Sequence, residues 1–212
     1  MGEKTQALIS ILKLQPVVPV LVIRDLAHAV PLARALVAGG LKAIEITMRT
    51  PVALQAIRAV ADEVEGAVPG AGTVLNAKQY HQAVEAGSQF IVSPGTTLEL
   101  LDVARKSPVP LLPGAATPSE VMALREEGYE VLKFFPAEQA GGAAYLKSLS
   151  SPLAGMMFCP TGGITPDNAR DYLSLPNVVC VGGSWVAPNA LVEAGDWDGI
   201  TRLATEASRL SA

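Results

Sequence analysis

Short apolar segments recur in this chain about every two dozen residues, and this repetition limits the possible folds more than any other feature of the sequence. Each segment is rich in β-branched residues and is followed by a stretch of helical periodicity, so each pair predicts a strand and then a helix. Glycines before many segments and glycine- or proline-rich turns after them agree with this division. The eight predicted strands are residues 17–23, 42–47, 67–70, 90–93, 109–112, 131–135, 156–159 and 178–181.

Eight βα units within 212 residues predict an α/β protein of one domain, residues 1–212, folded as a single (β/α)8 TIM barrel. A short amphipathic N-terminal helix containing Leu8, Ile9 and Leu12 is expected to close the bottom of the barrel. A helix over residues 196–210 is expected to complete the outer ring. The alternative is a doubly wound open sheet, which rarely uses eight units that are so short and so evenly spaced.

The composition excludes several classes of function. Half of the residues are hydrophobic and only 5% are aromatic, which is typical of strands covered on both faces. The net charge of −4 argues against nucleic-acid and membrane partners, because both require a basic surface. No apolar run reaches the length of a membrane span. A chain of this size with two cysteines does not need disulfides, so we expect a cytoplasmic protein.

Lys133 is the candidate nucleophile. Catalytic residues of the predicted barrel lie at the carboxyl ends of its strands, and among the seven lysines only Lys133 falls inside the later part of a predicted strand. Burial favours the neutral amine, which is the form that attacks a carbonyl carbon. A purely structural pair with an internal carboxylate is the alternative role.

Two further candidates lie in and after the second predicted strand. Alternation along residues 42–47 puts Glu45 on the face opposite to Ile44 and Ile46, whose side chains suit the side that faces the helices. Glu45 is therefore expected to point into the barrel, where a carboxylate acts as an ion-pair partner or a proton carrier. Arg49 follows in the loop, where its guanidinium could hold a carboxylate through two parallel hydrogen bonds, or could simply be solvated.

Two glycine-rich turns follow the last two predicted strands, one with Gly162 and Gly163 and the other with Gly183 and Ser184. Glycine lets backbone N–H groups approach an anion, and barrels commonly bind phosphate at this position. Glycine also serves ordinary tight turns, so it is the pair of turns on adjacent strands that favours a phosphate site. The sequence shows no cluster of metal ligands at the strand ends, so we predict neither a metal nor a cofactor.

Six motifs follow one another along the chain: EITMRT at 45–50, GAGTV at 70–74, SPG at 93–95, KFFPAE at 133–138, CPTGG at 159–163 and GGSW at 182–185. With these motifs the chain resembles the bacterial 2-keto-3-deoxy-6-phosphogluconate (KDPG) aldolases, a family that also includes 4-hydroxy-2-oxoglutarate aldolase activity. The resemblance extends from about residue 16 to the final helix. KFFPAE alone is distinctive.

The resemblance implies a class I aldolase that cleaves KDPG reversibly to pyruvate and glyceraldehyde 3-phosphate, without a metal and as a homotrimer. Its partners would be 2-keto acids and sugar phosphates. The implied roles are imine formation for Lys133, acid and base catalysis for Glu45, carboxylate binding for Arg49 and Thr73, a pocket wall for Pro94, stereochemical preference for Thr161, and phosphate binding for Gly162, Gly163, Gly183 and Ser184.

Two other functions stay open at this point. A related aldolase could prefer the galactose-configured 2-keto-3-deoxy sugar phosphate, although the resemblance at Thr161 favours the gluconate configuration. A barrel that binds phosphorylated metabolites without catalysis is the second alternative. That reading predicts the loss of Lys133 or Glu45, and the chain has both.

Overall fold

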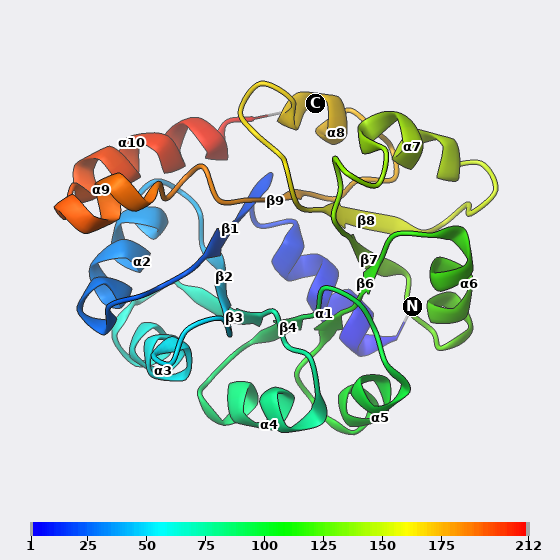
Figure 1. Cartoon of the computed structure of the whole chain (residues 1–212), viewed down its shortest axis with the longest axis horizontal. Helices are drawn as coiled ribbons and strands as arrows, with labels where there is room; N and C mark the ends of the chain where they lie inside the picture. The colour runs from blue at the N-terminus through cyan, green and yellow to red at the C-terminus, as the bar shows by residue number, and fades with distance from the viewer. Residues whose placement is uncertain (1, 211–212) are drawn as a thin grey trace.

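The computed structural model describes residues 2–210, and in it a ring of helices surrounds the strands (Figure 1). The strands are β1 Val17–Leu21, β2 Ala43–Thr47, β3 Val68–Gly72, β4 Phe90–Val92, β5 Leu111–Leu112, β6 Gly114–Ala115, β7 Val131–Phe134, β8 Met157–Pro160 and β9 Val181–Gly183. The helices are α1 Glu3–Leu12, α2 Ala29–Ala38, α3 Ala53–Glu63, α4 Ala77–Glu85, α5 Leu98–Lys106, α6 Pro118–Glu126, α7 Gly142–Leu149, α8 Ala169–Leu173, α9 Asn189–Ala194 and α10 Trp197–Ser208, with a 3-10 helix at Leu26–His28.

The strands form two parallel sheets instead of one closed barrel. Six of them pair in the order β5-β4-β3-β2-β1-β9, and three pair in the order β6-β7-β8. The predicted eight-stranded (β/α)8 TIM barrel is therefore wrong. The larger sheet curls into half a barrel and the small sheet is a separate ladder, which makes this a related (β/α) fold.

The first break between the sheets lies at Pro113. Leu111 and Leu112 pair with β4, whereas Gly114 and Ala115 pair with β7. Proline has no N–H to donate, so a hydrogen bond of the ladder is missing at Pro113. The strand predicted over residues 109–112 thus corresponds to β5 alone, and β6, which belongs to the other sheet, was not predicted.

The second break lies between β8 and β9, which are joined by isolated bridges from Phe158 to Val178 and from Thr161 to Gly182. Two residues separate these bridges on the β8 side and three separate them on the other, so the segments lose register as they do at a β-bulge. The strand predicted over 178–181 is wrong for this reason, because β9 begins only at its last residue.

The alternation predicted for the second strand is confirmed in β2. Ile44 and Ile46 belong to the large apolar core that the helices share. Ala43 belongs to a second, smaller cluster, which includes the buried residues of α1. Glu45 is on the same face as Ala43 and is only 3% exposed, so the pleat of β2 carries a carboxylate into the interior.

The N-terminal helix α1 packs against the strands, as Figure 1 shows near the middle of the molecule. Leu8, Ile9 and Leu12 are buried in the smaller cluster with Phe90 and Val131 of two strands. These three side chains cover apolar surface that would otherwise face water, and burial of each side chain stabilises the fold by about 1.5–3 kcal/mol.

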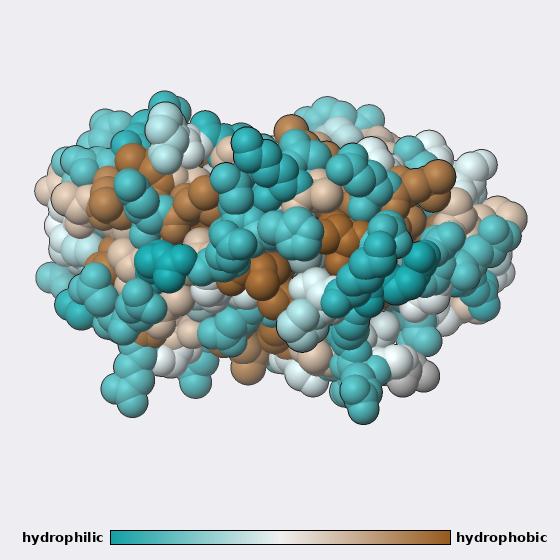
Figure 2. Space-filling model, turned by 90° about the horizontal axis from the view of Figure 1, so that it is seen from below, coloured by the Kyte–Doolittle hydropathy of each residue, from teal (hydrophilic) through white to brown (hydrophobic). Residues whose placement is uncertain are grey.

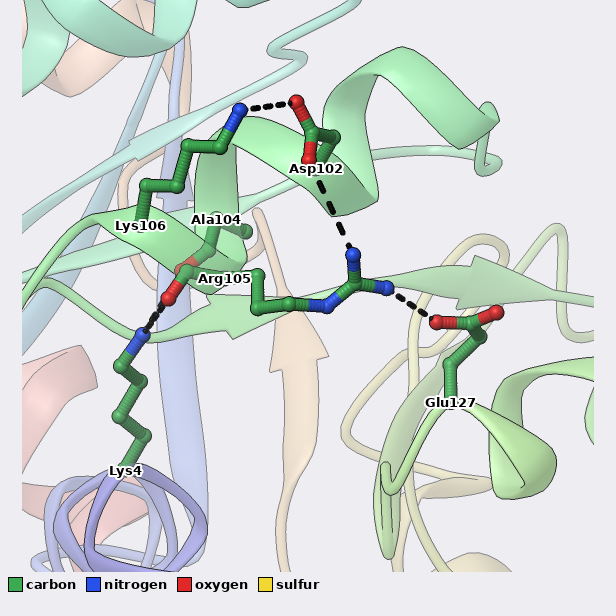
Figure 3. Close-up of polar contacts among 6 residues, drawn as sticks. All are labelled: Lys4, Asp102, Ala104, Arg105, Lys106 and Glu127. Atoms are coloured by element: carbon green, nitrogen blue, oxygen red, sulfur yellow. Dashed lines mark hydrogen bonds and ion pairs between the residues drawn. The ribbon is translucent and has the colours of Figure 1, made fainter.

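Lys4 connects α1 to the neighbouring helix α5 through hydrogen bonds (Figure 3). The Lys4 ammonium donates hydrogen bonds to the carbonyls of Ala104 and Arg105, at 3.0 and 2.7 Å. These carbonyls lie in the last turn of α5, where the helix itself offers no donor. The Arg105 side chain pairs in turn with Glu127, just after α6, at 2.5 Å.

The surface over α4 and α5 mixes polar side chains with apolar patches (Figure 2). Large apolar residues that are exposed include Leu75, Leu98 and Met122, which belong to three consecutive βα units. Within residues 2–210, the helices are too short or too polar to cross a membrane.

Candidate active site

A cavity of about 770 Å³ opens where several strands end. It collects side chains and turns that follow β1, β2, β3, β4, β8 and β9, together with Lys133 of β7. The predicted site residues in its wall are Arg49, Thr73, Pro94, Lys133, Thr161, Gly162, Gly163, Gly183 and Ser184. Glu45, the remaining one, lies behind the wall and contacts Lys133, so the fold brings all of the predicted site residues together.

Lys133 and Glu45 form a buried pair. The Lys133 Nζ atom lies 3.2 Å from Glu45 Oε1, and the two residues are only 5% and 3% exposed. The ammonium also lies 5.3 Å from the centre of the Phe135 ring. A charge in such surroundings is stable only with a partner, and here each residue supplies the partner of the other.

The Glu45 carboxylate occupies the space that a side chain at position 72 would fill, so this position requires glycine. A Cβ atom at Gly72 would lie 2.1 Å from Glu45 Oε1, which no real contact allows. The next residue, Thr73, has φ of +56°, a left-handed conformation that a β-branched residue rarely adopts. Strain of this kind persists where the surrounding structure imposes it, and such residues are concentrated at functional sites.

Two arginines line the cavity, and the sequence analysis found only one of them. Arg49 follows β2 and was predicted, whereas Arg24 follows β1 and was missed. The signal for Arg24 was the same as for Arg49, a basic residue just after a strand at the carboxyl end. Both side chains are exposed, so an acidic protein presents two cations to any anion that enters this cavity.

The two glycine turns lie side by side in the cavity wall, where Thr161 and Gly182 form a bridge. Gly162 and Gly163 have φ of +103° and +76°, values that favour glycine. Gly183 is covered by Trp185, because a Cβ at this position would lie 1.9 Å from the indole ring. The Thr161 hydroxyl is buried beside Gly182 and has no hydrogen-bond partner within the described part of the chain.

The two cysteines lie near this region but point into the apolar interior. Cys180 donates to Cys159 across 3.5 Å, and both are buried. The neighbouring thiol and burial raise the pKa of the Cys180 thiol well above its ordinary value, so it stays protonated. Among residues 2–210, no group of three or more His, Cys, Asp or Glu side chains is placed to hold a metal ion.

A buried lysine paired with a carboxylate, in a cavity whose wall also holds two arginines and two glycine turns, suits an enzyme that forms an imine with an anionic carbonyl substrate. The family model for KDPG and KHG aldolases matches residues 8–203. The chain belongs to this family.

Three relatives show how similar the chain is to other members of the family. The KHG/KDPG aldolase of Escherichia coli K12 is 53% identical over 198 residues, which are 93% of each chain. The structure of KDPG aldolase from Legionella pneumophila, with pyruvate captured at low pH as a covalent carbinolamine, has a TM-score of 0.93 at 44% identity over 98% of each chain. The Zymomonas mobilis ZM4 KDPG aldolase with 3-phosphoglycerate has a TM-score of 0.90 at 53% identity over 96% of each chain.

Proposed function

We propose that this chain is a class I aldolase that cleaves KDPG to pyruvate and glyceraldehyde 3-phosphate, reversibly, and that also acts on 4-hydroxy-2-oxoglutarate. The observation that carries the proposal is the buried Lys133–Glu45 pair, 3.2 Å apart, at a cavity whose wall also holds two arginines and two glycine turns. The names of the relatives support both substrates, since the Escherichia coli relative carries a double name.

The first half of the reaction joins Lys133 to the substrate. The neutral amine attacks the C2 carbonyl and forms a C–N bond, and the oxygen takes up a proton to give a carbinolamine. Glu45, directly or through a water molecule, then supplies the proton with which the hydroxyl leaves as water. The product is a protonated imine, which withdraws electrons from the adjacent carbon.

The second half breaks the carbon–carbon bond. The C4 hydroxyl gives its proton to the Glu45 carboxylate, and the C3–C4 electron pair moves into the imine to form an enamine. Glyceraldehyde 3-phosphate leaves as the aldehyde. Protonation of the enamine at C3 and hydrolysis of the imine release pyruvate and restore the amine of Lys133.

The remaining site residues bind the two ends of the substrate. We assign Arg49 and Thr73 to the pyruvyl carboxylate, and Gly162, Gly163, Gly183 and Ser184 to the phosphate. Pro94 forms part of the wall between these ends. Thr161 is assigned to stereochemical preference, and its place in the cavity wall beside Gly162 supports that role.

A relative with preference for the galactose-configured sugar phosphate is the alternative function. The two epimers differ at a single hydroxyl, and a well-placed polar group discriminates such a pair more strongly than an apolar wall does. We also propose that residues 1–212 form one cytoplasmic domain and that the protein is a homotrimer. The membership of the chain in the KDPG and KHG aldolase family supports the homotrimer, which the resemblance implies.

Trapping with borohydride tests the proposal. Pyruvate and borohydride should leave a reduced adduct on Lys133 alone, and Lys133→Met should abolish both the adduct and KDPG cleavage. Lys42→Met is the matched control, because Lys42 is exposed just before β2 and should keep both. An adduct that maps to another lysine, or activity that chelation removes and a divalent cation restores, would refute this mechanism.

A further inference from the structure

We propose that Asn168 and Tyr172, which lie outside the cavity, are positioning residues for the Gly162–Gly163 turn and set the affinity of the cavity for the phosphate end of the substrate. The inference rests on the proposed function, in which this turn binds phosphate. Neither residue is part of the cavity wall, and both belong to the segment that follows the turn and leads through α8.

Backbone hydrogen bonds from the segment after β7 fix the carbonyl of Gly162. It accepts a hydrogen bond from the N–H of Glu138 at 3.1 Å, and the carbonyl of Thr161 accepts one from the N–H of Ala137 at 2.8 Å. In a trans peptide the C=O and N–H groups point in opposite directions. The N–H of Gly163 is therefore directed away from Glu138, and Glu138 lies outside the cavity wall that the turn forms.

The carbonyl of Gly163 is held by a side chain. Asn168 Nδ2 donates to it at 3.1 Å, and Asn168 Oδ1 accepts from the N–H of Thr165 at 2.8 Å. The amide of Asn168 is thus fixed at both ends. By the same geometry, the N–H of Ile164 points away from Asn168.

Tyr172 secures the segment that holds Gly162. Its ring is fully buried, and its hydroxyl donates to Glu138 Oε1. Burial, and after it the Glu138 carboxylate, raise the pKa of the Tyr172 phenol, so the hydroxyl keeps the proton that it donates. The Glu138 side chain lies directly against Gly163, where a Cβ would be 2.6 Å from Glu138 Cγ.

In this turn the carbonyls of Gly162 and Gly163 accept hydrogen bonds, whereas within residues 2–210 the N–H groups of Gly163 and Ile164 donate to no backbone carbonyl. Successive N–H groups directed to one side make a concave site for an anion. Loss of either polar contact should let the peptide planes rotate and should weaken phosphate binding, without moving Lys133 or Glu45.

The test uses inorganic phosphate as the probe of the turn. Tyr172→Phe removes the hydroxyl that donates to Glu138 and keeps the buried ring. Asn168→Ala removes the side-chain amide that donates to the carbonyl of Gly163. Each change should weaken inhibition by phosphate and raise KM for KDPG about 3- to 10-fold, and Tyr172→Phe should have the larger effect because its hydrogen bond is to a carboxylate. The kcat for KDPG, kcat/KM for 4-hydroxy-2-oxoglutarate and the exchange of pyruvate methyl protons should stay at wild-type values.

Tyr145→Phe is the matched control, because this half-buried tyrosine stacks on Phe134 and its hydroxyl makes no hydrogen bond within the described residues. It should change none of these values. Unchanged phosphate inhibition in both test variants would overturn the inference, and so would an equal loss for both substrates, which would indicate general damage to the fold.

The two proposals can fail separately. If the wild-type protein binds phosphate but does not cleave KDPG, the proposed function fails, and phosphate affinity of the variants still decides the role of Asn168 and Tyr172. If Tyr172→Phe does not fold, Asn168→Ala decides it alone. A wild-type protein that cleaves KDPG but has no affinity for phosphate would overturn the inference and leave the proposed function standing.

Discussion

The amine of Lys133 lies 3.2 Å from a carboxylate oxygen of Glu45, although 88 positions separate them along the chain. Both side chains are buried, and a buried ion pair is seldom more stabilising than apolar side chains of the same size. Removal of one partner is much more costly, at about 3–5 kcal/mol, because a charge is then left alone in the interior. Stability therefore does not explain this pair, whereas the proton transfer proposed for Glu45 would account for it.

Glu45→Gln should separate substrate binding from proton transfer. The amide keeps the size of the side chain and can still form a hydrogen bond, so pyruvate should still occupy the cavity. Cleavage should fall by about 10²–10⁴-fold, the usual contribution of a positioned acid or base. Exchange of pyruvate methyl protons with D₂O, followed by NMR, should slow in parallel. Exchange at the wild-type rate would show that another group moves the proton.

Gly72→Ala should give a similar loss without touching the carboxylate chemically. The new Cβ would lie 2.1 Å from Glu45 Oε1, so the carboxylate must move away from Lys133. Pyruvate binding, measured by calorimetry, should persist while the exchange rate falls by at least about 10-fold, because proton transfer requires hydrogen-bond geometry. Gly95→Ala is the control, since a Cβ there meets no atom within 4 Å and should leave the rate unchanged. Equal effects of the two substitutions would contradict this account.

The position of Glu45 could be predicted from the alternation along its strand, and that of Lys133 from its place in the later part of a predicted strand. Alternation along a strand fixes which face a side chain occupies, and both β2 and β7 keep that alternation over their whole length. Arg49, Thr73 and the glycine turns could be located because each follows a strand. Their roles stay predictions, since position alone does not define what a residue binds.

The closure of the sheet could not be predicted in the same way. Apolar periodicity reports that a strand exists, but whether neighbouring strands form a continuous ladder depends on single residues such as Pro113. The register between β8 and the segment that leads into β9 changes between the two isolated bridges, because that segment has one additional residue. Arg24 was missed although its signal was present, because no motif marked it.

Arg49→Ala should weaken the transition state by about 1.5–3 kcal/mol, the range for a hydrogen bond to a charged group, which is roughly 10- to 150-fold in kcat/KM. The loss should be the same for KDPG and for 4-hydroxy-2-oxoglutarate, because both carry the 2-keto acid end that is assigned to Arg49. Arg24→Ala provides the comparison, since Arg24 lines the same cavity but has no assigned role. A loss at Arg49 confined to phosphorylated substrates would place it at the phosphate end.

Thr117 and Glu120 form a capping box at the start of α6, and this box should make part of the stability depend on pH. The Thr117 hydroxyl accepts from the N–H of Glu120 at 3.3 Å, and Glu120 Oε2 accepts from the N–H groups of Ala116 and Thr117 at 2.8 and 2.9 Å. The bond from Ala116, with those from Thr117 and against the effect of burial, holds the pKa of Glu120 below its ordinary value of 4.5. The folded state thus prefers the ionised carboxylate.

The contribution of Glu120 should be complete above its unfolded pKa, near 4.5, and should be lost as the pH falls through the lower folded value. Glu120→Gln should therefore lower the free energy of unfolding at about pH 6, by less than about 1 kcal/mol because this cap is exposed, and the gap to wild type should shrink at about pH 3.5. Thr117→Ala should cost about 1 kcal/mol at both values, since threonine does not titrate. Urea unfolding of the three proteins at each pH measures these gaps. A gap for Glu120→Gln that is constant with pH would mean that the hydrogen bonds to the cap do not depend on its charge.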